Sequence, residues 1–188
     1  HTPCERVKAL PGGHLAAWTV AEADAATQHL PAELSRVVQL ARFTGQRRGD
    51  LIAMTWAAYD GRTIRVRQQK GGATMAIPCH PTLRAALDEW KRAATSTHIL
   101  TSAKGRPWQA NHLTHTMAIV LPKIGLRGEL NVHGLRKLAA ASLADAGCST
   151  HEIAAITGHR TLAMLRLYTA TAAQDRLATA ASVRLGSA

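Results

Sequence analysis

Apolar residues recur at helical spacing over most of the chain, starting with residues 19–45. Thr19 and Glu22 have the spacing of a capping box, which predicts the start of a first helix. A second helix is predicted from Pro31 to Gly45, because its apolar positions follow the i, i+3, i+4, i+7 pattern of a buried face: Leu34, Val37, Val38 and Ala41. We expect a short third helix to begin near Arg47.

The pattern changes from helical spacing to alternation over residues 62–78. Apolar residues alternate with other residues before and after a Gly-Gly pair: Ile64, Val66, Met75 and Ile77. Two alternating segments separated by glycines are typical of a β-hairpin, so a small antiparallel sheet is predicted here.

Helical spacing returns after the hairpin and continues through the rest of the chain. Two apolar stripes indicate two helices, one with Leu83, Leu87 and Trp90 and one with Leu113, Met117, Val120 and Ile124. A helix is predicted over residues 132–147. A brief helix follows, which begins at a second capping box formed by Ser149 and Glu152 and ends at Gly158. Two more helices are predicted after residue 160. The chain is therefore expected to be a mainly helical α+β domain with a small antiparallel β-hairpin sheet.

Composition and charge indicate the class of partner. The 188 residues, of which 46% are apolar, fit one domain of ordinary size. Lysine and arginine outnumber acidic residues 23 to 12, and they are spread along the chain, so we expect a folded basic surface for a polyanion. No apolar run approaches the roughly 20 residues that span a bilayer, and the N-terminus lacks the apolar region of a signal peptide. We therefore expect no membrane partner.

The cysteines do not suggest disulfides or a metal site. Cys4, Cys79 and Cys148 are odd in number and lack paired spacing, so they are interpreted as free thiols in a reducing cytoplasm. Cys148 and His151 have a C-x-x-H spacing, but no second pair completes a zinc site. No metal and no cofactor are expected.

Two arginines stand where they could meet a phosphate. Arg47 lies just after a Thr-Gly turn at a helix start, and Asp50 lies on the same face, close enough to hold its guanidinium. Arg136 and His133 project from one side of another helix start, with Arg136 at the edge of a buried stripe. The alternative for each is a solvated side chain, with Arg47 merely paired to Asp50.

Two more residues sit at flexible points of the chain. Lys70 is predicted at the hairpin tip before two glycines, where it could reach a reacting group as a proton donor. His159 follows Gly158 at a helix break, which leaves a ring nitrogen free to point at a ligand. Most such lysines are simply solvated, so the position alone decides nothing.

Four stretches together resemble the catalytic domain of the tyrosine recombinases, the phage integrase family: TGQRRGDLIAMTW, QKGGATMAIP, HGLRKLAAASLADAG and TGHRTLAMLRLYT. The resemblance covers roughly residues 15–180 and keeps the family's order and spacing, including a tyrosine nine residues after the histidine of the Gly-His pair. Lys137 replaces a common histidine, and Met164 and Leu165 replace small hydroxyl residues. These departures bear on DNA contacts rather than on a catalytic role.

The resemblance implies a role for each candidate in an attack on a DNA phosphodiester. Arg47 and Arg136 are similar to the pair that clamps the non-bridging oxygens of the scissile phosphate, and Asp50 to the residue that supports Arg47. Tyr168 is similar to the nucleophile, and Lys70 to the general acid. His133 is similar to the general base or tyrosine-orienting group, and His159 to a third donor on the phosphate.

The implied activity is site-specific DNA recombination (integration or excision) through a covalent 3′-phosphotyrosyl intermediate, without metal, cofactor or ATP. The implied partner is duplex DNA, and no small-molecule substrate is implied. The protein is expected to be a monomer when free and a tetramer in the synaptic complex. Its implied location is the cytoplasm, in association with the nucleoid. Two alternatives remain at this point. One is relaxation of supercoils by a type IB topoisomerase-like enzyme, and the other is a DNA-binding module with a decayed site.

The domain organisation expected from the resemblance has two parts. Residues 1–14 are interpreted as a linker or arm from a missing N-terminal DNA-binding domain, and residues 15–188 as the catalytic domain. A C-terminal helix at about residues 172–185 packs either on its own domain or on a neighbouring protomer, and the sequence does not choose between them.

Overall fold

The structure is a computed structural model that describes residues 16–159 and residue 165. Its elements are α1 (Val20–His29), α2 (Ala32–Thr44), α3 (Arg48–Ile52), η2 (Trp56–Ala58), β1 (Thr63–Arg67), β2 (Thr74–Pro78), α4 (Pro81–Arg92), α5 (Ala110–Val120), η3 (Leu121–Ile124), α6 (Val132–Asp145) and α7 (Thr150–Thr157). The predicted mainly helical α+β fold with a two-stranded antiparallel sheet is confirmed. Apart from Leu165, the helices predicted after residue 160 lie outside the described residues.

Local sequence signals set the helix bounds as predicted. Thr19 and Ser149 cap α1 and α7 and accept the N–H groups of Glu22 and Glu152, whose carboxylates accept the N–H groups of the caps in return. Helix α2 ends at Gly45, whose φ of 61° is in the left-handed region that glycine enters without a steric penalty. None of the helices in the described ranges is long and apolar enough to cross a membrane.

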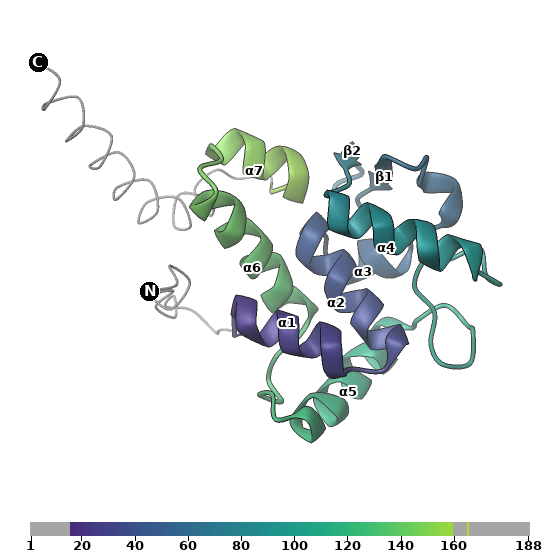
Figure 1. Cartoon of the computed structure of the whole chain (residues 1–188). Helices are drawn as coiled ribbons and strands as arrows, with labels where there is room; N and C mark the ends of the chain where they lie inside the picture. Colours follow the sequence, from purple (N-terminus) through teal and green to yellow (C-terminus); the bar gives the residue numbers. More distant parts are fainter. Residues whose placement is uncertain (1–15, 160–164, 166–188) are drawn as a thin grey trace, which may run out of the picture.

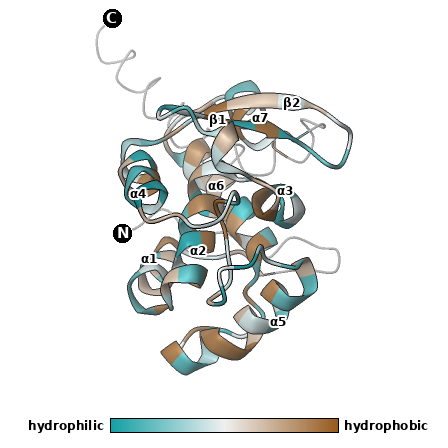
Figure 2. Cartoon of the chain, turned by 90° about the vertical axis from the view of Figure 1, so that its right-hand side faces the viewer, coloured by the Kyte–Doolittle hydropathy of each residue, from teal (hydrophilic) through white to brown (hydrophobic). Residues whose placement is uncertain are grey.

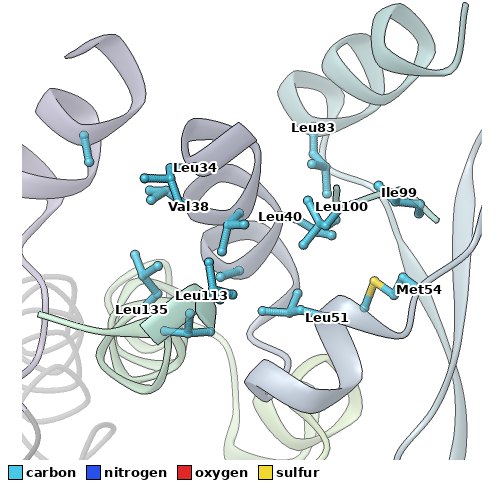
Figure 3. Packing of buried hydrophobic residues seen from close by; sticks show 14 of the residues in the cluster. Leu34, Val38, Leu40, Leu51, Met54, Leu83, Ile99, Leu100, Leu113 and Leu135 are labelled. Atoms are coloured by element: carbon cyan, nitrogen blue, oxygen red, sulfur yellow. The ribbon is translucent and has the colours of Figure 1, made fainter. Parts of the chain in front are cut away.

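Helix α2 is the centre of the molecule. It contacts α1, α3, α4 and α6, which lie around it in Figure 1. Its apolar side chains meet residues from all parts of the fold in one buried cluster, shown in Figure 3: Leu34, Val38, Leu40, Leu51, Met54, Leu83, Ile99, Leu100, Leu113 and Leu135. Because α2 is held on several sides, the segment that follows it, which includes Arg47, has a well-defined place.

The hairpin lies at one end of the molecule, near α7. Strands β1 and β2 pair with Ile64 opposite Ile77 and Val66 opposite Met75, while Arg65 and Arg67 are exposed. Figures 1 and 2 both place the hairpin and α7 at the end opposite α5, and β2 contacts α7. The hairpin and the end of α7 therefore belong to the same region of the fold.

The helix predicted to run through Ile124 is shorter in the structure. Helix α5 ends at Val120, and residues 121–124 form the 3-10 turn η3. Pro122 explains the change, because it lacks the N–H that an α-helix needs at that position. Ile124 still packs against the core, so the apolar spacing was informative about burial but not about the helix end.

The start of α6, which carries two candidate residues, is held by the segment before α1. Asn131 caps α6 by accepting from the N–H groups of His133 and Gly134, and its carbonyl accepts from Trp18 Nε1 at 2.9 Å. Gly134 faces the same segment so closely that a Cβ there would lie 2.2 Å from the carbonyl oxygen of Ala16 and 2.8 Å from Trp18 Cδ1. A side chain at this position is therefore excluded.

We predict that Gly134→Ala lowers the free energy of unfolding by about 1–3 kcal/mol, because the added methyl must displace backbone. The expected drop in Tm, measured by calorimetry, is about 2–12 °C for a chain of this size. Gly128→Ala is the matched control, since its Cβ would meet nothing nearer than Pro122 Cγ at 3.3 Å. Equal Tm values for the two variants would contradict the packing described here.

Candidate active site

Arg136 is the most buried charged group of the site, with 2% of its surface exposed. Its Nη1 donates hydrogen bonds to the carbonyl oxygens of Gly45 at 2.7 Å and Thr157 at 2.5 Å. These carbonyls stand at the C-terminal ends of α2 and α7, where the helix dipole places partial negative charge. The sequence placed Arg136 at the edge of the buried face, whereas the structure buries it and joins three helices through it.

Arg47 and Asp50 lie together, but less tightly than predicted. Arg47 is the N-cap of α3, and its Nη1 lies 3.9 Å from Asp50 Oδ2, beyond hydrogen-bond distance. This Nη1 is buried and makes no hydrogen bond within the described part of the chain. Asp50 is also buried, and its Oδ1 accepts the backbone N–H of Gln69 at 2.8 Å. Asp50 thus anchors the hairpin to α3 and leaves Arg47 with hydrogen-bonding capacity for an anion.

Two buried glutamines, which the sequence analysis did not single out, connect the hairpin to α7. Gln46 Nε2 donates to the carbonyl of Ile156 at 2.8 Å, and Gln68 Nε2 donates to Gln46 Oε1 at 3.1 Å and to the carbonyl of Thr157 at 3.3 Å. Gly158 leaves room for this pair, because a Cβ there would lie 2.1 Å from Gln68 Nε2. The available signal was that Gln46 directly precedes Arg47 inside a motif stretch and that Gln68 stands two residues before Lys70.

The two histidines lie in a positively charged environment. Loss of solvent and the charges of Lys137, Arg136 and Arg47 lower the pKa of His133, although the residue keeps solvent exposure. Burial, followed by the charges of Arg136, Arg47 and His133, lowers the pKa of His159 to about 4. Both rings are therefore neutral at pH 7. Arg136 and His159 both contact Thr157, Arg136 also contacts Gly45 two residues before Arg47, and His133 lies one turn before Arg136 on α6, so the four side chains form one cluster.

The structure does not add Lys70 or Tyr168 to this cluster, for different reasons. Lys70 is exposed on the hairpin turn, next to Gln69, and within the described residues no hydrogen bond or ion pair joins it to the two arginines or the two histidines. Tyr168 lies outside the described residues. Three residues before it, Leu165 is fully buried against Ala140, Ala144 and Ile153 of α6 and α7.

The cluster formed by Arg47, His133, Arg136 and His159 is suited to bind an oxyanion. Two guanidinium groups supply fixed positive charge and forked donors, which match the oxygens of a phosphate. Each neutral ring adds one hydrogen-bond donor and one acceptor. Such an arrangement stabilises the negative charge that builds up when a phosphodiester is attacked.

The chain is similar to integrases of known sequence and structure. Residues 19–175 match the Phage integrase family. The integrase of Escherichia phage HK022 is 30% identical over 125 residues, which cover 61% of this chain and 35% of that protein. The structure of the lambda integrase catalytic core has a TM-score of 0.65 at 25% identity, covering 76% of this chain and 94% of that one. The structure of a lambda integrase tetramer bound to a Holliday junction has a TM-score of 0.69 at 26% identity, covering 81% of this chain and 47% of that one.

The family match extends over most of the chain, and the chain belongs to the phage integrase family. Its matched part spans about a third of the HK022 integrase, since the aligned residues cover 35% of that protein. The similarity to the lambda integrase structures applies to the helical domain with its hairpin, which is the fold described above.

We predict that Asp50→Ala destabilises the protein by about 1–3 kcal/mol, because the Gln69 N–H loses the charged acceptor of a partly buried hydrogen bond. Hydrogen exchange followed by NMR should show faster exchange at Gln69, and calorimetry a lower Tm. Asp50→Asn keeps a side-chain oxygen and should retain most of the protection. Asp24→Ala removes a surface ion pair with Arg42 and should change stability by about 0–1 kcal/mol. Unchanged exchange at Gln69 in Asp50→Ala would show that Asp50 does not anchor the hairpin.

Proposed function

We propose that this chain carries the catalytic domain of a tyrosine site-specific recombinase, which cleaves and rejoins duplex DNA through a covalent 3′-phosphotyrosyl intermediate. The observation that supports this most is the cluster of two arginines and two histidines at the ends of α2, α6 and α7 in a member of the phage integrase family. The domain would extend over residues 15–188, and the family match over residues 19–175 agrees with that extent.

In the proposed reaction the phenolic oxygen of Tyr168 forms a bond to phosphorus while the bond from phosphorus to the 5′ oxygen breaks. Arg47 and Arg136 hold the non-bridging oxygens and balance the charge that develops on them. The phenolic proton passes to His133, whose lowered pKa keeps it neutral and able to accept it. Lys70 gives a proton to the leaving 5′ oxygen, and its place on the exposed hairpin turn allows it to approach a bound strand.

The phosphotyrosyl bond conserves the free energy of the broken phosphodiester, so religation to the original or to a new 5′-hydroxyl needs no ATP. A tyrosine phenol has a pKa near 10 and is a weak nucleophile until its proton is removed. The four charged or ionisable side chains around the phosphate therefore provide the activation, and a metal is not required by the proposed chemistry.

The proposed partner is duplex DNA, and the net charge of +11 suits it. Binding through phosphate contacts should weaken steeply as salt is raised. A lambda integrase structure is a tetramer bound to a Holliday junction, and we propose that this chain is a monomer when free and assembles similarly on paired sites. The proposed location is the cytoplasm, in association with the nucleoid.

The test of this proposal is covalent trapping on DNA. The protein is incubated with nicked duplexes whose cleavage product loses a short strand, so that religation is prevented, and adducts are separated on a denaturing gel. We expect an adduct from the parent chain and none from Tyr168→Phe, because the phenylalanine lacks the attacking oxygen. Arg136→Lys should lower adduct formation by about 10²-fold or more, since a lysine cannot make the forked contacts of the guanidinium.

The matched control is Tyr59→Phe, because Tyr59 is the other tyrosine of the chain and its hydroxyl only donates to Asp88 on α4. An adduct that persists in Tyr168→Phe would refute the assignment of the nucleophile. Supercoil relaxation without recombinant product at any paired site would favour the topoisomerase-like alternative. A parent chain that binds DNA but forms no adduct would favour a binding module with a decayed site.

A further inference from the structure

Thr157, the last residue of α7, contacts His159 through a hydrogen bond that restricts the histidine ring. Thr157 is fully buried, and its Oγ1 lies 2.7 Å from His159 Nδ1 and 2.6 Å from the carbonyl oxygen of Ile153. The backbone carbonyl of Thr157 is one of the two acceptors of Arg136. One residue therefore contacts both an arginine and a histidine of the cluster, through different atoms.

The number of hydrogens settles which nitrogen of His159 carries a proton. The Thr157 hydroxyl has one hydrogen, and the Ile153 carbonyl has none to offer, so the hydroxyl donates to that carbonyl. The hydroxyl can then only accept from His159, which places a hydrogen on Nδ1. In the neutral ring Nε2, on the other side of the imidazole, is left with a lone pair and no hydrogen.

The groups that face His159 favour this neutral form when no anion is present. They are Arg136 and His133 of α6 and Arg47 before α3, while the hairpin contributes the uncharged Gln68 beside Gly158. Burial in the first place, and then these positive neighbours, hold the pKa of His159 at about 4. A phosphodiester bound to the two arginines would offset their charge, and its own negative charge beside the ring would favour the protonated imidazole.

We propose that Thr157 is a positioning residue that leaves Nε2 of His159 as the nitrogen available to the DNA phosphate, and that phosphate binding is therefore coupled to uptake of one proton at Nε2. A phosphate oxygen only accepts hydrogen bonds, so the bare lone pair of neutral Nε2 has nothing to give it. The proton comes from solvent and makes Nε2 a charged donor. This inference rests on the proposed function, because it takes a DNA phosphate as the ligand of the cluster.

The first experiment reads the tautomer in the free protein. Histidine-labelled protein is studied by NMR at pH 7 through the couplings that distinguish Nδ1–H from Nε2–H rings. We expect the Nδ1–H form for His159 in the parent chain and in Thr157→Ser, which keeps the hydroxyl. Thr157→Val keeps the shape and the carbonyl that holds Arg136, and it should lose the preference for Nδ1–H. A parent His159 in the Nε2–H form would overturn the proposal.

The second experiment measures proton uptake on binding. Calorimetric titrations with a mixed-sequence duplex at pH 7, in two buffers of different ionisation enthalpy, give the number of protons taken up. We expect about one more proton per bound site for the parent and Thr157→Ser than for His159→Gln, and a Kd that rises up to about tenfold per pH unit. His29→Gln, on the exposed end of α1, is the control histidine and should keep the uptake of the parent.

The outcomes separate this inference from the proposed function. A parent chain that forms the Tyr168 adduct but takes up no more protons than His159→Gln would refute the coupling and leave the recombinase proposal intact. A chain that forms no adduct and binds no duplex would refute the proposed function, while the tautomer of His159 would still test the role of Thr157. Thr157→Val that matches the parent in tautomer, proton uptake and adduct formation would refute the positioning role.

Discussion

The buried guanidinium of Arg136 organises the end of the molecule that carries the site. A charged group removed from water needs hydrogen-bond partners, and here two helix C-termini provide them through Gly45 and Thr157. Each of these residues lies two positions before another member of the cluster, namely Arg47 and His159. The bonds that compensate the buried charge therefore also bring the two other side chains to the place where Arg136 lies.

The cluster is electrostatically unfavourable without an anion. Two arginines share a small region with two histidines, and their charges contribute to the lowered pKa values of both rings. Around it, uncharged and backbone groups maintain the geometry: Gln46 and Gln68 join the hairpin to α7, and Asp50 joins it to α3. The folded chain thus holds a preorganised positive site, and a bound phosphodiester would relieve the repulsion within it.

Much of the fold and part of the site were predictable from the sequence. The capping boxes at Thr19 and Ser149, the glycine stop of α2 and the presence of the hairpin depend on residues close together in the sequence, so periodicity and turn residues indicate them. The family motifs likewise pointed to the four side chains that the structure brings together. Lys70 and Tyr168 remain predictions, the first because it is on an exposed turn and the second because it lies outside the described residues.

Within the described residues the sequence by itself determined where the helices and the hairpin form, although not the end of α5, together with the basic character and the order of the motif residues. Tertiary structure decided how those residues are used: it buried Arg136 instead of leaving it at an edge, gave Asp50 a bond to the hairpin, and made Thr157 a contact of both Arg136 and His159. The reason is the distance along the chain. Arg136 and Gly45 are 91 residues apart, and Gln68 and Thr157 are 89 apart, so these contacts exist only once α2, α6, α7 and the hairpin have packed together.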